Sequence, residues 1–301
     1  MSAVTVLRTL PETRGWQVAA DYASLTKPRI IELLLVTTVP AMLVAAGGWP
    51  GTALVLATLV GGAAVSGSAH ATNMVIDRDI DGAMRRTAHR ALPTGRISPA
   101  GAVVFAALLL VAGTTLLLAV AGWLAAALTV AAWVHYVCVY TLWLKRRSVQ
   151  NIVIGGAAGA APPLIGWAAV TGQLAAPAWV LFALVTLWTP THFWALAVGT
   201  GRDYALAGVP MLPVVRGPAV AARHGAVYAL LTVLSALLLP VLGVGGWPLA
   251  GLTVVLGSWF LVRAVALVRD PSPRPAWRLF HGSNAFLATF SVAVAVTAFV
   301  G

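Results

Sequence analysis

Long apolar stretches follow one another along the chain, separated by short polar or glycine-containing connections. Each stretch holds roughly 20 residues, the length that a helix needs to cross the hydrocarbon core of a bilayer. The pattern therefore predicts an all-α, polytopic membrane protein with nine transmembrane helices. These spans are expected at about residues 30–48, 52–76, 99–120, 122–143, 151–171, 177–199, 219–243, 247–268 and 279–300.

The connections between these stretches are of two alternating kinds. Those near residues 48–51, 121–122, 171–177 and 243–248 are minimal and contain neither Lys nor Arg. With nine spans, all 19 basic residues fall on the other side, which the positive-inside rule places in the cytoplasm. We therefore expect a multi-pass protein of the cell (plasma) membrane, with its N-terminus in the cytoplasm and its C-terminus outside.

The first residues differ from the rest in their mixed polar and apolar character. They lack a compact apolar core followed by a small-residue cleavage site, so a removable signal peptide is not expected. No linker separates soluble domains. The sequence predicts a cytoplasmic N-terminal segment at 1–28 and a single transmembrane domain at 29–301 with an elaborated cytoplasmic face.

Composition supports the membrane interpretation and narrows the possible partners. Hydrophobic residues make up 60% of the 301 positions and charged residues only 9%, which excludes an ordinary soluble domain or a disordered chain. In a membrane chain, the net charge of +11 indicates orientation or an anionic substrate, and no nucleic-acid partner is expected. The single cysteine, Cys138, excludes an internal disulfide and a cysteine-clustered metal site.

The segment after the second span concentrates acidic residues. Asn73, Asp77 and Asp81 are spaced i, i+4, i+8, so on a helix they share one stripe from which Asp79 points away. Oxygen ligands at such spacing suit Mg²⁺, which commonly binds through one or two carboxylates plus substrate phosphates. A solvated acidic loop, neutralised by neighbouring arginines, is an alternative that the spacing leaves open.

Other charged residues of the same face extend this hypothesis. Asp203, after the sixth span, would complete a magnesium site opposite Asp77 and Asp81, or would act only as a helix cap. Basic side chains suit the binding of phosphate groups, although each is also explained by membrane topology. The candidate phosphate ligands are Lys27, Arg29, Arg85, Arg86, Lys145 and Arg146. Together these acids and bases suggest metal-bridged binding of a phosphorylated, lipid-soluble substrate.

Five sequence segments carry a resemblance to a known family. They are DYASLTKPRI at 21–30, NMVIDRDIDGAMRRT at 73–87, LKRRSVQNIVIGGAAGAAPPLIGWAAVTG at 144–172, WTPTHFWALA at 188–197 and DYALAGVPMLPVV at 203–215. The aspartate segment resembles the first motif of the UbiA superfamily of intramembrane prenyltransferases. The run at 151–172 and the AGVPMLP segment at 207–213 resemble more specifically its heme-farnesylating branch. In the second motif only Asp203 is acidic, because Ala207 stands where other branches have a second acid.

The resemblance implies a fold and a reaction. The fold is a UbiA-like bundle with a central cavity and an active-site face on the cytoplasmic side. The reaction transfers the farnesyl group of farnesyl diphosphate to a vinyl group of heme b, with addition of water, giving heme O for terminal oxidase assembly. Asn73, Asp77, Asp81 and Asp203 would hold Mg²⁺, and Asp77, Asp81 and Asp203 would be the catalytic residues. Asn73 would also bind the diphosphate, together with the basic residues named above. Heme A synthase or oxidase assembly factors would be partners, alongside the lipid bilayer.

One histidine stands out once heme is considered. His192 lies in TPTHFW, toward the middle of the sixth span, where an idle polar ring is costly. It is the candidate for contact with heme, as an axial ligand or through a propionate. A hydrogen bond to a neighbouring helix would explain it equally well.

Two other functions compete with heme farnesylation. A related UbiA-type enzyme acting on a quinone precursor or a chlorin would share the aspartates without requiring the 151–172 or AGVPMLP segments. A transporter or channel would be expected to show inverted repeats and broken half-helices.

Overall fold

The computed structural model describes residues 15–300, with the side chains of 29–35 left out. Residues 1–14 of the expected N-terminal segment and the side chain of Arg29 therefore lie outside the described part. Within it the chain is entirely helical, without a strand. The helices are α1 (Gly15–Leu25), α2 (Pro28–Ala46), α3 (Thr52–Ile76), α4 (Arg78–Ala83), α5 (Pro99–Val120), α6 (Gly122–Val134) continued by the π-helix η1 (His135–Leu144), α7 (Asn151–Ala160), α8 (Pro162–Thr171), α9 (Ala176–Gly199), α10 (Gly201–Leu206), α11 (Leu212–Val215), α12 (Pro218–Val241), α13 (Gly246–Arg269) and α14 (Pro273–Thr297).

Eight helical segments of the described chain are long and apolar enough to cross a membrane, so this is a multi-pass membrane protein. They are α3, α5, α6 with η1, α7 with α8, α9, α12, α13 and α14. The remaining expected span corresponds to α2, whose described apolar part is the shorter Val36–Ala46. Nine spans therefore remain a proposal.

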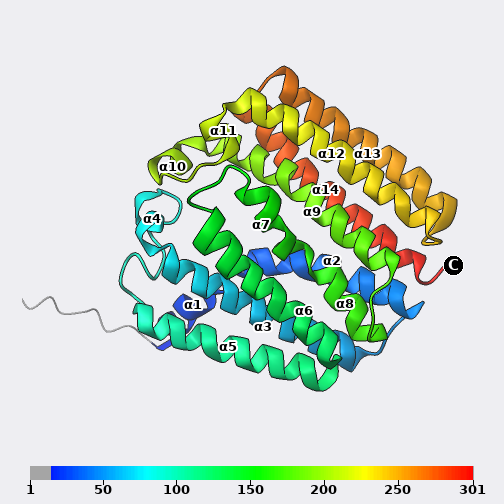
Figure 1. Ribbon diagram of the computed structural model, residues 1–301, viewed down its shortest axis with the longest axis horizontal. Coiled ribbons are helices and arrows are strands. Elements are labelled where there is room, and N and C mark those ends of the chain that lie inside the picture. The colour runs from blue at the N-terminus through cyan, green and yellow to red at the C-terminus, as the bar shows by residue number, and fades with distance from the viewer. Residues whose placement is uncertain (1–14, 301) are drawn as a thin grey trace, which may run out of the picture.

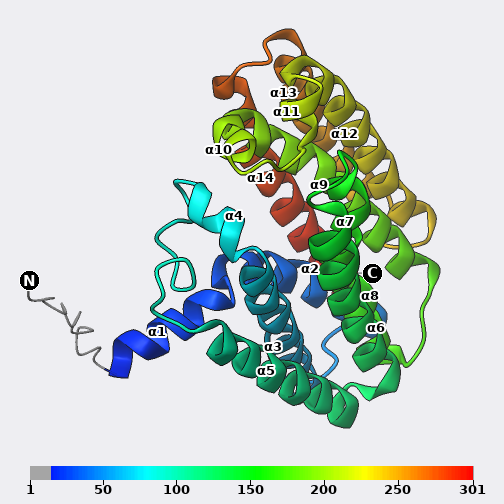
Figure 2. The same ribbon diagram turned by 60° about the vertical axis from the view of Figure 1, so that its left-hand side comes forward.

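The long helices form a bundle with two unlike ends (Figure 1). Helices α1, α4, α10 and α11 and the α13–α14 connection lie at one end, which we call the charged end. The short turns between α2 and α3, α5 and α6, α8 and α9, and α12 and α13 lie at the other. A second view shows α4 and α10 again at the same end (Figure 2). This arrangement brings segments that are far apart in sequence to one face.

Small residues allow close helix packing. A Cβ added to Gly113 of α5 would lie 2.7 Å from the carbonyl oxygen of Gly61 in α3. A Cβ added to Gly166 of α8 would lie 2.8 Å from the Thr38 carbonyl oxygen in α2. Without a hydrophobic driving force between helices in lipid, such backbone approach and dispersion contacts hold the bundle together.

Two expected spans are interrupted in ways that shape the interior. The 151–171 span divides at Ala161 into α7 and α8, because the prolines Pro162 and Pro163 lack the N–H groups that would continue the helix. The 122–143 span ends in a π-helix, whose last turn is closed by the Lys145 N–H donating to the Tyr140 carbonyl at 2.8 Å. π-Helical turns occur frequently at functional sites.

Candidate active site

A cavity of about 700 Å³ lies inside the bundle, and residues near the charged end, such as Asp81 of α4 and Tyr204 of α10, are part of its lining. Six of the residues selected from sequence line it: Lys27, Asn73, Asp81, Arg86, Lys145 and His192. Four others do not: Asp77, Arg85, Arg146 and Asp203. Much of the remaining lining is apolar or small, including Gly155, Gly156 and Gly159 of α7. The cavity thus has a charged region and an apolar region in one space.

Asp77 lies at the junction of two helices rather than within one. Helix α3 ends at Ile76, and Asp77 (φ −91°, ψ 7°) separates it from α4. The i→i−4 backbone hydrogen bonds nevertheless continue, from Asp77 N–H to Asn73 at 2.9 Å and from Asp81 N–H to Asp77 at 2.8 Å. The expected stripe is therefore largely retained across a bend. Asp77 and Asp81 are 1% and 3% exposed, whereas Asp79 faces outward.

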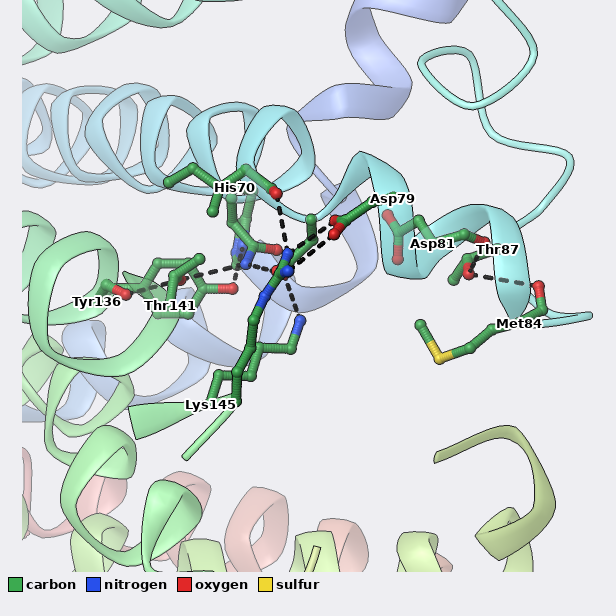
Figure 3. Close-up of polar contacts among 12 residues, drawn as sticks. His70, Asp79, Asp81, Met84, Thr87, Tyr136, Thr141 and Lys145 are labelled. Atoms are coloured by element: carbon green, nitrogen blue, oxygen red, sulfur yellow. Dashed lines mark hydrogen bonds and ion pairs between the residues drawn. The ribbon is translucent and has the colours of Figure 1, made fainter. Parts of the chain in front are cut away.

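The Asp77 carboxylate is enclosed by three donors from two segments, α3 and the turn after η1. Asn73 Nδ2 donates to Asp77 Oδ2 at 2.6 Å, and Lys145 Nζ donates to the same oxygen. Arg146 Nη2 lies 3.4 Å from Asp77 Oδ1. Figure 3 shows Lys145 reaching this cluster from the end of η1, with Asp79 and Asp81 beside it on α4. Asp77 therefore does not line the cavity itself but contacts two residues that do, Asn73 and Lys145.

Asp81 has a partner that the sequence reasoning did not select. Arg90 Nη1 donates to Asp81 Oδ2 at 2.7 Å, and Arg90 itself lines the cavity. The Thr87 hydroxyl donates to the Asp81 carbonyl at 2.7 Å and holds the intervening loop against α4. In the sequence, Arg90 was only one of several arginines in a basic loop, so its role was not visible there.

Lys27 adds a third half-buried cation to Arg90 and Lys145. It adopts a left-handed conformation (φ 53°) between α1 and α2, and its Nζ donates to Asn73 Oδ1 at 3.0 Å. Burial, together with repulsion from Arg90 and Lys145, lowers the pKa of Lys27 to about 7. An anion placed in the charged region would relieve this repulsion and favour the protonated amine.

The outward-facing pair Asp79–Arg146 is separate from the cavity. Both guanidinium nitrogens of Arg146 donate to the Asp79 carboxylate at 2.8 Å. These bonds lower the pKa of Asp79 to about 2, so this carboxylate stays ionised at neutral pH. The pair is solvent-exposed, with Asp79 60% accessible, and its electrostatic contribution to stability is small.

The second acidic segment is α10, which contains Asp203, and it contacts the cavity residue Arg86. Arg86 Nε lies 4.0 Å from Asp203 Oδ2, and the Arg86 guanidinium stands 4.9 Å from the centre of the Tyr204 ring. Tyr204 of α10 is buried and lines the cavity, whereas Asp203 beside it does not. Both adjacent arginines are exposed, but Arg85 does not line the cavity whereas Arg86 does. Of the two adjacent arginines, the structure brings only Arg86 to the site.

We expect Arg86→Gln to raise the KM for the prenyl diphosphate that the sequence resemblance implies about tenfold, because hydrogen bonds to charged groups contribute roughly 1.5–3 kcal/mol. The matched change Arg85→Gln removes the same charge from an exposed loop position and should alter KM less than about twofold. Steady-state kinetics of both variants measure the difference. Equal losses in the two would show that general surface charge, and not the Arg86 position, governs diphosphate binding.

The oxygen donors at this site fit Mg²⁺ in kind. In the described part of the chain, no group of three or more His, Cys, Asp or Glu side chains is arranged to hold a metal. Asp77 and Asp81 are each paired with a cation, Lys145 and Arg90 respectively. The Asn73 amide and the two carboxylates are hard oxygen ligands, and Mg²⁺ commonly takes only one or two carboxylates and completes its shell with phosphate oxygens and water.

His192 lies in the same cavity, about two helical turns before the end of α9. Its ring stacks between Trp188 (centroids 4.3 Å apart) and Phe280 (4.5 Å). Its Nδ1 is 2.8 Å from the Ser283 hydroxyl of α14, which leaves Nε2 without a hydrogen-bond partner in the described part of the chain. A histidine held through one ring nitrogen, with the other free, is the arrangement found at many metal-ligating histidines.

The sequence of the chain matches the model of the UbiA prenyltransferase family over residues 34–290. The chain belongs to the UbiA prenyltransferase family. This UbiA family member is 50% identical over 277 residues to a protein named protoheme IX farnesyltransferase from Gloeobacter violaceus, with 92% of this chain and 91% of that one covered. It is also 50% identical to a protein of that name from Thermus thermophilus, with 92% of this chain covered. It spans only 45% of the length of the Thermus protein.

Solved structures share the fold of this UbiA family member. A digeranylgeranylglyceryl phosphate synthase matches with a TM-score of 0.78 at 19% identity, covering 95% of this chain and all of that one. A UbiA homologue from Archaeoglobus fulgidus, solved with GPP and Mg²⁺ bound, matches with a TM-score of 0.64 at 16% identity, covering 92% and 99% of the two chains. The expected all-helical UbiA-like fold is thereby confirmed.

Proposed function

We propose that this protein is a heme b farnesyltransferase. It transfers the farnesyl group of farnesyl diphosphate to a vinyl group of heme b and adds water to give heme O. The observation that carries the proposal is that one cavity contains both the charged cluster and His192, in a chain half identical to proteins named protoheme IX farnesyltransferase. The charged cluster suits a diphosphate, and the apolar region around His192 suits a prenyl chain and a porphyrin.

At the charged end, the chain's own cations bind the diphosphate. Lys27, Arg90 and Lys145 are buried or half-buried around the cavity, and Arg86 stands at its edge. Mg²⁺ held by Asn73, Asp77 and Asp81, with Asp203 as the acid from the second motif, would neutralise the leaving diphosphate. Lys145 and Arg90 balance the charge of these two carboxylates, so neither acid is left as an uncompensated buried charge.

The reaction then follows from where charge develops. The bond between C1 of the farnesyl group and the diphosphate oxygen breaks, and the electron pair leaves with the diphosphate. The terminal vinyl carbon of heme forms the new carbon–carbon bond to C1, which leaves a cation on the carbon next to the porphyrin ring. Water captures that cation and loses a proton, giving a hydroxyethylfarnesyl group. Trp133, Trp188 and Phe280 in the cavity wall help to keep water out until that step.

We propose that His192 contacts heme and so orients the reacting vinyl group. Stacking on both faces and the Ser283 contact fix the imidazole ring, so Nε2 is the nitrogen available to the iron or a propionate. The product would pass to heme A synthase or oxidase assembly factors.

We propose that the protein crosses the plasma membrane nine times, with the charged end and residues 1–28 in the cytoplasm and 29–301 as one domain. In a Cys138→Ala background, a cysteine replacing Arg147 should react with a membrane-impermeant maleimide only from the cytoplasmic side. One replacing Gln173 should react only from outside. The reason is the confinement of Lys and Arg to one set of connections. Labelling of both positions from the same side would contradict nine spans.

The most informative test of substrate class is a choice of acceptors. Purified protein is given radiolabelled farnesyl diphosphate and Mg²⁺ with heme b, with an aromatic acid that models a quinone precursor, or with a chlorin. Label should move to heme b alone. Transfer to the aromatic acid or the chlorin, with heme b unmodified, would favour the related prenyltransferase instead.

A further inference from the structure

A second hollow lies outside the active-site cavity, as an open groove of about 750 Å³ between α13 and α14. Its polar lining is basic and aromatic: Trp259, Arg263, Arg274, Trp277, Arg278 and His281. No acidic side chain lines it, and none of its three arginines forms an ion pair within residues 15–300. The groove is therefore an uncompensated positive site at the side of the bundle.

The Arg263 side chain lies in this groove because of the way α13 and α14 pack against each other. Its guanidinium stands 4.3 Å over the Trp259 ring, and its Nε is buried without a hydrogen-bond partner. A Cβ on Gly282 would lie only 2.6 Å from Arg263 Cδ, so the glycine makes room for the arginine side chain to cross α14. A buried donor left unpaired costs free energy, and an anionic ligand would satisfy it.

The position of the groove defines what kind of anion reaches it. Arg274, Trp277 and Arg278 belong to the first two turns of α14, at the charged end of the bundle, and all three are exposed. Tryptophan and arginine at the end of a span lie at the level of the lipid headgroups. Basic pockets between transmembrane helices bind the headgroups of anionic lipids, with each arginine contributing about a fivefold gain in affinity.

Opposite faces of one turn of α14 line the active-site cavity and the α13–α14 groove. Phe280 and Ser283 contact His192 on the cavity side. His281 and Gly282 line the groove on the other side. The groove is thus separated from the active-site cavity by the helix itself, and binding there does not depend on the reaction proposed above.

We propose that the α13–α14 groove is a binding site for the phosphate of an anionic phospholipid. Arg274 and Arg278 provide the charge, Arg263 the buried donor, and Trp259 and Trp277 the apolar flanks for the upper acyl chains. The occupant is a lipid of the leaflet at the charged end and not a soluble anion, since the groove lies between two apolar spans and tryptophans stand beside its arginines.

The test measures lipid binding to the intact protein by native mass spectrometry, with phosphatidylglycerol and phosphatidylcholine of identical acyl chains as probes. The wild type should hold phosphatidylglycerol at least 25-fold more tightly than phosphatidylcholine. Arg274→Gln combined with Arg278→Gln should weaken phosphatidylglycerol about 25-fold and leave phosphatidylcholine unchanged. Gly282→Ala, which displaces Arg263, should weaken it about fivefold.

Arg269→Gln is the matched control, because Arg269 ends α13 in the same connection without lining the groove. It should bind phosphatidylglycerol as the wild type does. Equal affinity of the wild type for the two lipids, or a loss in Arg269→Gln as large as in the double variant, would overturn the proposal. Exposed Arg→Gln changes leave the helix packing intact, and a thermal unfolding curve verifies this for each variant.

Discussion

Asp77→Asn and Asp81→Asn are each expected to lower farnesyl transfer by about 10²–10³-fold at saturating Mg²⁺, because each removes one negative charge from the site that stabilises the leaving diphosphate. Both carboxylates are buried and lie one helical turn apart on the same stripe. Turnover is measured at matched protein levels. Heme binding, followed by its absorption spectrum, should persist in both variants, since these acids serve the diphosphate.

Asp79→Asn is the control for this pair of variants. It makes the same chemical change two residues from each acid, but Asp79 is exposed and bonds only Arg146 among the described side chains. Its turnover should stay within about threefold of the wild type, as surface changes usually do. A loss as large as that of Asp77→Asn would mean that the segment binds metal as a loop and that the helical stripe is not the organising feature. A melting temperature for each variant separates loss of chemistry from loss of the Asp77–Lys145 contact.

His192→Ala is expected to reduce heme affinity by more than about 100-fold, whereas the affinity for farnesyl diphosphate should remain nearly unchanged. Removal of a group that merely supports a metal ligand typically costs 10–100-fold, and loss of the ligand itself should cost more. Ser283→Ala, which removes the contact to His192 Nδ1, should therefore produce an intermediate loss. Heme titrations followed by absorption spectroscopy provide both values.

His224→Ala is the control for His192→Ala, because it removes an imidazole that lies outside the cavity. His224 of α12 contacts the Val220 carbonyl and does not line the cavity, so His224→Ala should bind heme as the wild type does. If His192→Ala retains full activity and an unaltered heme spectrum, the assignment of His192 to heme fails.

Much of the fold could be predicted from local sequence. The limits of α3 and α5 agree with the expected 52–76 and 99–120, because long apolar runs there end abruptly. For α5, Ser98 and Pro99 supply an N-cap and a first-turn proline. Helix α14 begins at Pro273 and not at 279, because arginines in its first turns interrupt the apolar run without interrupting the helix.

The interruptions within spans were harder to predict. Pro162 and Pro163 were a visible local signal for the α7–α8 break. The π-helix before Lys145 has no comparable signal, because its extra residue per turn depends on tertiary packing and not on local propensity. The bend at Asp77 likewise ends a helix without proline or glycine at the junction.

The candidate site was predictable as a set of residue types but not as a set of contacts. Sequence spacing places Asp77 and Asp81 together because one turn of helix does so. Sequence spacing does not distinguish Arg85 from Arg86, because the two residues are adjacent and differ only in where their side chains point. It also missed Arg90, whose contact with Asp81 depends on the path of a loop. Two partners of His192, Phe280 and Ser283, come from α14, about 90 residues later, and only the tertiary fold brings them to it.

The central claim is that one cavity brings the diphosphate and the porphyrin together for farnesyl transfer. Mass spectrometry of heme extracted after incubation of the purified protein with heme b, farnesyl diphosphate and Mg²⁺ tests it most directly. The wild type should yield a porphyrin heavier by one farnesyl group and one hydroxyl, and Asp77→Asn should form it about 10²–10³-fold more slowly. Recovery of unmodified heme b from the wild type, while farnesyl diphosphate is consumed, would contradict the claim.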